Sequence, residues 1–275
     1  MRAFPYLLCA AFLACGCATA SAQDYVAAHQ VAAARGGPLP IPHEVEPGLD
    51  TNRAYEIQKA IVARRLQTDA IGGFKGGLPT RAAQIAAGAN EPMMGVLFES
   101  GRRSTAVAIR LHSGVTTMAE VELGFINHLR IDKPAPDVET LKSYFRTATP
   151  VVELPKVVFA DVAKATTVDH IATNVGSDLY IVGTPVRLRA GAPSALQAQL
   201  EQGGVTVAEG RPAELNKDHW AALLWLVNKA VSEYGPVEPG RIFITGSFTK
   251  AAPVAPGDYV ASLSGFAPVR FSGEQ

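Results

Sequence analysis

The chain has 275 residues, of which 48% are apolar, 18% charged and 7% aromatic, a composition that is typical of a globular protein and excludes a disordered or collagen-like one. Lysine plus arginine and aspartate plus glutamate both number 25, and the sequence contains no block of like charge. We therefore expect neither nucleic acid nor an anionic membrane surface as a partner, and any charge that matters for function should act locally.

The N-terminal segment has the pattern of an export signal. After Arg2, residues 7–18 form an apolar stretch, and residues 20–22 (Ala-Ser-Ala) supply a small-residue cleavage site before Gln23. Such a short stretch cannot cross a hydrocarbon core of roughly 30 Å as a stable anchor. We therefore expect residues 1–22 to be a signal peptide and the mature protein to be exported, periplasmic or secreted, with no stable membrane anchor after cleavage.

The cysteines are confined to this N-terminal segment. Cys9, Cys15 and Cys17 all lie inside the expected signal, so the mature chain would have no thiol, which excludes a cysteine nucleophile and a zinc-thiolate site. Two alternatives to cleavage near Ala22 stay open. One is a lipoprotein acylated at Cys15 or Cys17, and the other is retention of the segment as an anchor.

The first part of the mature chain is expected to be helical. Residues 23–50 begin with an Ala-rich helical piece and continue into an extended, Pro- and Gly-rich connector over 36–42. Asp50 and Thr51 offer N-caps for a helix over 53–67, whose aliphatic side chains fall on one stripe that needs a partner surface.

From about residue 94 the pattern changes to strands. Helices are expected over 138–146, 194–202 and 217–233, and strands over 95–98, 106–111, 119–126, 151–159, 179–183, 205–209, 241–245, 259–264 and 269–272. The strands lack the regular alternation with helices that a doubly wound parallel sheet requires, so the predicted class is α+β. The predicted organisation is an N-terminal helical portion with a Gly-rich active-site loop over 23–90, followed by a catalytic domain over 91–275.

Several common catalytic motifs are missing from the sequence. It has no phosphate-cradling Gly-rich loop, no His-x-x-x-His pair and no Gly-x-Ser-x-Gly elbow. Although Gly246 precedes Ser247, the histidines are scattered along the chain, so we do not expect a serine nucleophile.

Two acids occur close together in one predicted strand. Side chains alternate on a strand, so Glu120 and Glu122 should project from the face opposite Val121 and Leu123. Two rises of about 3.3 Å separate their attachment points by about 6.6 Å, close enough for both carboxylates to reach one ion. The alternative is an ordinary solvated strand face.

A third acid, Glu153, lies inside an apolar strand. Burying an unpaired carboxylate there costs several kcal/mol unless the charge is neutralised or coordinated. Three carboxylates with water suit a hard divalent cation such as Mg²⁺ or Mn²⁺. The alternative for Glu153 is a salt bridge to a basic residue such as Lys156.

A Gly-rich stretch over 72–80 surrounds a single lysine, Lys75. Glycines on both sides allow the backbone to approach a ligand closely and hold the lysine between flexible flanks. The ammonium could bind a carboxylate or, if its pKa were lowered, take part in proton transfer. The alternative is a mobile surface loop with a solvated lysine.

The order of these segments resembles the 2-keto-4-pentenoate hydratase and oxaloacrotonate decarboxylase group of the fumarylacetoacetate hydrolase superfamily. The resemblance covers roughly residues 53–271. It rests on an ordered set of motifs rather than on any single one: Gly73-Phe74-Lys75-Gly76-Gly77-Leu78, Gly95-Val96-Leu97-Phe98, Glu120-Val121-Glu122, Glu153, Asn174 before Tyr180-Ile181-Val182-Gly183, Trp225-Leu226-Val227-Asn228 and Ile244-Thr245-Gly246-Ser247.

The resemblance implies a mixed β-roll or sandwich with flanking helices, and a small-molecule 2-oxo acid or 2-hydroxydienoic acid as substrate. It also implies a divalent metal, Mg²⁺ or Mn²⁺, and the roles of the family's site residues can be carried over residue by residue. The metal ligands fall on Glu120, Glu122 and Glu153, the active-site lysine on Lys75, and the substrate-binding positions on Leu78, Thr245, Gly246 and Ser247. A metal would stabilise the enolate that forms when the diene tautomerises.

Some positions depart from the family pattern. Phe74 stands where an arginine is common, and Ser100 lies near the position of an expected aspartate. Leu154-Pro155-Lys156 replaces a Ser-Arg pair, and Thr173 stands where an aspartate precedes Asn174.

We expect an exported hydratase-like lyase that forms a homo-oligomer. The alternatives are a 2-oxo acid decarboxylase or acylpyruvate hydrolase of the same fold, or a secreted small-molecule-binding protein that has lost catalysis.

Overall fold

The computed structural model of the protein describes residues 20–188, 196–210 and 219–275. The three cysteines and most of the expected signal peptide lie outside the described residues. Helix α1 (Ala20–Arg35) begins just before the expected cleavage point at Gln23. In the part of the chain that the structure describes, no helix combines the length and apolar character needed to cross a membrane.

The helices lie mainly at one end and along one side of the molecule. In chain order they are α1, α2 (Pro42–Val45), α3 (Thr51–Arg65), α4 (Arg81–Ala86), α5 (Val138–Lys142), α6 (Thr167–Ala172) and α8 (His219–Tyr234), with 3-10 turns η1 (Glu99–Gly101), η2 (Val162–Lys164) and η3 (Asn174–Gly176). Asp50 caps α3 as expected, because its side chain accepts a hydrogen bond from the Arg53 amide at 2.8 Å.

The strands form two sheets. They are β1 (Ile71–Gly77), β2 (Met93–Phe98), β3 (Arg102–Ser104), β4 (Val107–Arg110), β5 (Thr116–Asn127), β6 (Phe145–Leu154), β7 (Lys156–Val157), β8 (Leu179–Val182), β9 (Val186–Arg187), β10 (Ala198–Gln202), β11 (Val205–Gly210), β12 (Ile242–Ser247), β13 (Ala252–Pro253), β14 (Gly257–Leu263) and β15 (Val269–Glu274). The larger sheet follows the order β2-β1-β12-β5-β6-β8-β3, and the smaller sheet follows β11-β10-β14-β15-β4.

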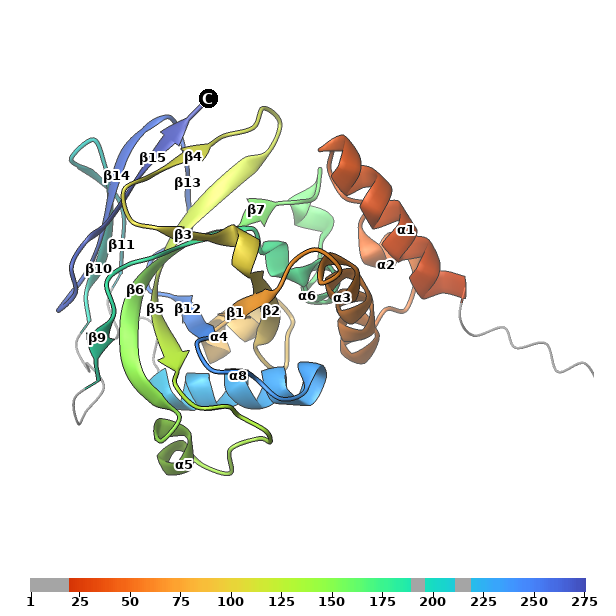
Figure 1. The fold of residues 1–275 in the computed structure, drawn as a ribbon. Helices are drawn as coiled ribbons and strands as arrows, with labels where there is room; N and C mark the ends of the chain where they lie inside the picture. Colours follow the sequence, from red (N-terminus) through yellow and green to blue (C-terminus); the bar gives the residue numbers. More distant parts are fainter. Residues whose placement is uncertain (1–19, 189–195, 211–218) are drawn as a thin grey trace, which may run out of the picture.

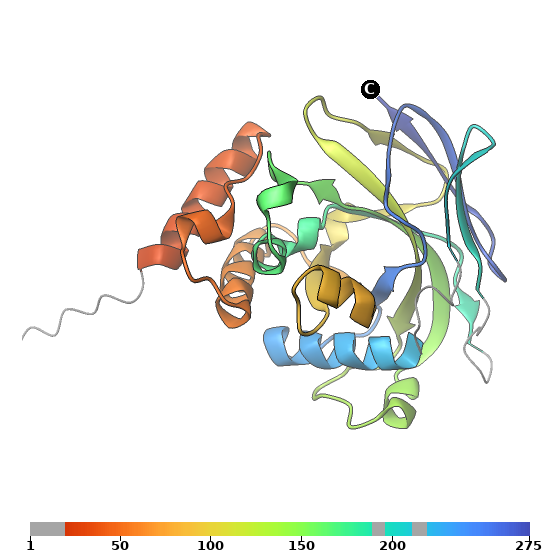
Figure 2. The same ribbon diagram turned by 180° about the vertical axis from the view of Figure 1, so that it is seen from behind.

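The two sheets face each other, since β10, β14 and β15 contact β5 and β6 (Figure 1). Helix α8 runs along the larger sheet, and α1, α2 and α3 lie at the end remote from the smaller sheet (Figure 2). The apolar residues that α8 buries are spaced as one helix face: Leu223, Leu226, Val227, Ala230 and Val231. These mixed sheets with flanking helices confirm the α+β class.

Two of the expected helices differ from the structure. The expected helix over 194–202 is wrong in its described part, because 198–202 form strand β10 between β11 and β14. Ala198 and Leu200 are buried while Gln199 and Glu201 are half-exposed, so pairing on both sides overrides the helix propensity of these residues. The expected helix over 138–146 ends at Lys142, where the chain turns into β6.

Strand β6 is longer than expected at its start and shorter at its end. It begins at Phe145 rather than residue 151, and it ends at Leu154 rather than residue 159. Pro155 follows directly and has no amide hydrogen to continue the ladder. Glu153 therefore lies near the end of a strand that pairs with β5 on one side and β8 on the other.

Candidate active site

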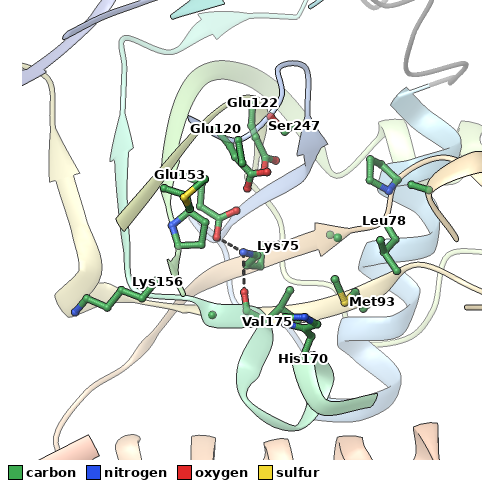
Figure 3. A pocket seen from close by; sticks show the side chains of 18 of the residues that line it. Lys75, Leu78, Met93, Glu120, Glu122, Glu153, Lys156, His170, Val175 and Ser247 are labelled. Carbon is green, nitrogen blue, oxygen red and sulfur yellow. Dashed lines mark hydrogen bonds and ion pairs between the residues drawn. The ribbon is translucent and has the colours of Figure 1, made fainter. Parts of the chain in front are cut away.

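Three acidic side chains meet on neighbouring strands of the larger sheet. Glu120 and Glu122 come from β5 and Glu153 from β6, and the antiparallel register places Glu120 directly opposite Glu153. Each contributes an oxygen to a group in which all three oxygens lie within 4.8 Å of one another. The structure thus brings together the three acids that the sequence singled out, and we call them the carboxylate triad (Figure 3).

Lys75 is the basic residue that pairs with the triad. It projects from β1, is 3% exposed, and its ammonium donates to Glu153 Oε1 and, at 3.1 Å, to the carbonyl oxygen of Val175. The alternative pairing of Glu153 with Lys156 is wrong, because Lys156 instead contacts Asp178 at 2.9 Å. Lys156 follows Pro155 on the short strand β7, where a different partner is in reach.

The glycines around Lys75 form a strand rather than the expected flexible loop. Strand β1 lies between β2 and β12. A Cβ on Gly72 would come within 2.2 Å of the Tyr180 hydroxyl, and one on Gly73 within 2.0 Å of the Ile242 carbonyl oxygen. These glycines are therefore required for close strand packing. Alternation along the strand points Phe74 into the core, where it stacks on Phe243, and leaves Lys75 on the site.

The carbonyl that accepts from Lys75 belongs to an unusual turn. Asn174, Val175 and Gly176 have φ values of +57°, +53° and +63°, and a β-branched residue such as valine rarely adopts this left-handed conformation. The Asn174 side chain fixes the turn to β2, since it accepts from the Val96 amide at 2.7 Å and donates to the Val96 carbonyl at 2.9 Å. The turn aims the Val175 carbonyl at Lys75.

The electrostatics of the triad suit a bound cation. Burial raises the pKa of Glu120 to about 7, and the charge of Glu153 adds to the rise while Lys75 opposes it. Burial and repulsion from Glu153 and Glu120 hold the pKa of Glu122 well above its ordinary value. For Lys75, burial alone would lower the pKa, but attraction to Glu153 and Glu120 outweighs it and leaves the pKa raised. Three acids beside one ammonium fit a hard divalent cation with oxygen ligands.

The triad and Lys75 open onto a pocket of about 490 Å³. Most other lining side chains are apolar, among them Leu78, Met93, Met118 and Phe159. Such a site combines one charged region with an apolar surface, which suits a small acid with a carbon chain.

The expected substrate-binding positions divide into two pairs. Leu78 and Ser247 line the pocket, whereas Thr245 and Gly246 are absent from its lining. The Gly246 amide instead donates to Glu122 Oε2 at 2.9 Å, and the Ser247 hydroxyl donates to the Thr249 carbonyl at 2.8 Å. Gly246 therefore acts on the triad rather than on the pocket surface.

His170 also lines the pocket and was not expected from the sequence. It lies on α6, and its ring packs edge-on against Phe159 with centroids 5.5 Å apart. The sequence offers no local signal for it, since a lone histidine in a short helix is typical of many surfaces. His170 reaches the pocket of Lys75 only because α6 packs against β2, the strand next to β1.

Comparisons with known proteins show what the whole chain resembles. No family model matches the chain. The chain is 27% identical over 239 residues to the 2-keto-4-pentenoate hydratase of Paraburkholderia xenovorans (strain LB400), which covers 86% of this chain and 88% of that protein.

The fold is similar to that of 4-oxalocrotonate decarboxylase from Pseudomonas putida G7. The structure of that enzyme complexed with magnesium and adipate gives a TM-score of 0.83 at 20% identity, covering 93% of this chain and 99% of that one. Its structure with calcium and acetate gives 0.82 at 20% identity, covering 92% and 97%.

The fold is that of the solved 4-oxalocrotonate decarboxylase, and the carboxylate triad is a candidate site for a divalent cation. In sequence and in fold the chain resembles the 2-keto-4-pentenoate hydratase and oxalocrotonate decarboxylase group of the fumarylacetoacetate hydrolase superfamily.

Proposed function

We propose that the protein is a divalent-metal-dependent hydratase-like lyase that adds water to a 2-hydroxydienoic acid through its 2-oxo-enoic form. The observation that carries the proposal is the triad of the half-buried Glu120 and the buried Glu122 and Glu153, which lies beside Lys75 in a largely apolar pocket. The hydratase of Paraburkholderia xenovorans supports the reaction class. Mg²⁺ or Mn²⁺ is the proposed cation.

Each residue of the site has a proposed task. Glu120, Glu122 and Glu153 would hold the cation, and the Gly246 amide orients Glu122 through its hydrogen bond. When bound, the cation supplies Lewis-acid stabilisation of the negative charge that develops as a 2-oxo acid enolises.

Lys75 orients Glu153 and places a positive charge where a substrate carboxylate can approach. Both acceptors of its ammonium, Glu153 and the Val175 carbonyl, fix its position. Leu78 and Ser247 are proposed to contact the substrate from the pocket wall, whereas Thr245 would act only through the backbone that carries Gly246. The apolar lining would exclude bulk water from the carbon chain.

The direct test is turnover of 2-hydroxypenta-2,4-dienoate by the purified protein with Mg²⁺ or Mn²⁺. Loss of the diene absorbance and NMR detection of 4-hydroxy-2-oxopentanoate are expected. Glu122→Gln, which preserves shape and removes charge, serves as the matched inactive control. A folded parent protein that converts no 2-hydroxydienoate at any metal concentration contradicts the proposal.

Decarboxylation of a 2-oxo acid is the second candidate, and the fold similarity to 4-oxalocrotonate decarboxylase favours it. The two reactions differ in their products. Release of CO₂ from an oxalocrotonate-type substrate, without addition of water to the simple dienoate, would assign the site to decarboxylation.

We also propose that the protein is exported and that copies associate. The apolar stretch over 7–18 and the small residues before Gln23 support export, and mass spectrometry of the native protein should find a chain starting near Gln23. An uncleaved or diacylated form contradicts export.

Association is supported by Val205 and Val207, which are 67% and 42% exposed on the edge strand β11. A monomer in light scattering at micromolar concentration contradicts association.

A further inference from the structure

The imidazole of His170 is a polar group of the pocket that the proposed tasks leave unused. It lines the same pocket as Lys75 and the triad. Figure 3 shows it beside Val175 and Met93, with Lys75 between it and the three carboxylates in this view. The edge-on contact with Phe159 holds the ring at the pocket wall.

The helix that carries His170 is firmly fixed. Asp169 accepts hydrogen bonds from the Thr166 amide and hydroxyl, both at 2.7 Å, which closes a capping box at the start of α6. The same carboxylate accepts from the His43 amide at 2.8 Å and contacts the His43 ring at 2.7 Å. The position of the His170 backbone is thus set by contacts outside the pocket.

The ring nitrogens of His170 are open to a ligand. Within the described residues neither nitrogen has a hydrogen-bond partner. Three other polar side chains of the lining already have partners: Lys75 donates to Glu153 and Val175, Lys156 pairs with Asp178, and Ser247 donates to Thr249. His170 therefore differs from them in having both a donor and an acceptor available.

We propose that His170 is the proton-transfer residue of the hydration step, an inference that rests on the proposed hydratase function. As the oxygen of water bonds to the conjugated carbon of the 2-oxo-enoate, the unprotonated ring nitrogen takes the proton that this water loses. The π electrons of the double bond move toward the 2-oxo group. The imidazolium then returns its proton to the neighbouring carbon, so that H and OH have been added across one double bond and His170 is regenerated.

The charge state of the ring agrees with this role. Burial lowers the pKa of His170, the charge of Lys75 lowers it further, and Asp169 opposes both effects. The ring is therefore neutral near pH 7, which is the form that accepts a proton.

The test compares His170→Gln with a matched control, His29→Gln. His29 is also a partly buried histidine whose pKa is lowered by burial, but it lines a different cavity. For each protein with Mg²⁺, we would measure kcat on 2-hydroxypenta-2,4-dienoate and the Kd of 2-oxopentanoate, a saturated analogue that cannot be hydrated. Thermal unfolding checks that each variant is folded, and His170→Asn replaces the glutamine variant if that one fails to fold.

We expect His170→Gln to lower kcat by roughly 10²- to 10⁴-fold, as for other general acid-base groups, with little change in Kd, and His29→Gln to change neither. Added imidazole should partly restore turnover of a folded His170→Ala variant. Two results with an active parent would overturn the assignment of His170 while the hydratase function stands. In one, His170→Gln retains the kcat of the parent; in the other, the Kd rises by as large a factor as kcat falls. If the parent hydrates no dienoate, both fall.

Discussion

Replacing Lys75 by methionine should destabilise the metal-free protein strongly. The side chains of Lys75 and Glu153 are only 4% and 1% exposed, and they form an ion pair in the core. Removing one partner of a buried pair typically costs about 3–5 kcal/mol, because the other charge is left uncompensated. For a protein of this size each kcal/mol lowers Tm by about 2–4 °C, so the expected loss is roughly 6–20 °C.

The assay is thermal unfolding in EDTA at about pH 8, where the triad is most fully charged. Lys59→Met is the matched control, because Lys59 contacts Glu233 at 2.9 Å while its side chain is 40% exposed. A surface pair of this kind contributes about 0–1 kcal/mol. Adding Mg²⁺ should raise the Tm of Lys75→Met more than that of the parent, because a cation replaces the missing positive charge.

A Tm of Lys75→Met equal to that of the parent in EDTA would refute this reasoning. It would mean that the carboxylates take up protons at no cost when the ammonium is removed. Equal losses in Lys75→Met and Lys59→Met would also refute it, since burial would then contribute nothing to the difference between the two pairs.

Three further predictions concern charge. Glu122→Gln should weaken Mg²⁺ or Mn²⁺ binding in calorimetry without unfolding the protein, and identical affinities would exclude Glu122 as a ligand. Because the pKa of Glu120 is raised to about 7, the native state holds a proton that the unfolded state has lost, so metal-free stability should fall as pH rises from about 5 to 8. Saturating Mg²⁺ should flatten this slope, and a flat profile in EDTA would contradict the prediction. Burial alone would raise the pKa of Asp169, but hydrogen bonds from Thr166 and His43 outweigh burial and lower it. The stability that this carboxylate contributes should therefore be lost as pH falls below the ordinary carboxyl range. Asp169→Asn should cost about 1–3 kcal/mol in urea unfolding, and an unchanged midpoint would argue against the network.

Local sequence patterns predicted the parts of the site that lie within one element. The period of two in β5 placed Glu120 and Glu122 on one face, and the apolar neighbours of Glu153 indicated a buried acid that needs a partner. The partner could not be deduced, because Lys75 and Glu153 are 78 positions apart and meet only through the strand order β1-β12-β5-β6. The nearer Lys156 was an equally reasonable alternative on sequence spacing.

The glycines of β1 show why composition misled the prediction of a loop. Glycine is usually a sign of flexibility, but Gly72 and Gly73 are needed because other atoms occupy the space of a side chain. The atoms that occupy this space belong to residues distant in sequence, Tyr180 and Ile242, so the local sequence does not show why glycine is needed. His170 was missed for a related reason, since nothing near it in the chain distinguishes it from a surface histidine.

The left-handed turn at Asn174, Val175 and Gly176 has a consequence for mutagenesis. The group that accepts from Lys75 there is a main-chain carbonyl, so no side-chain substitution at position 175 can delete it. Val175→Asn or Val175→Gly should keep the lysine in place, because these residues adopt positive φ more readily. Alanine scanning would therefore score the position as tolerant, although it supplies one of the two acceptors that hold Lys75.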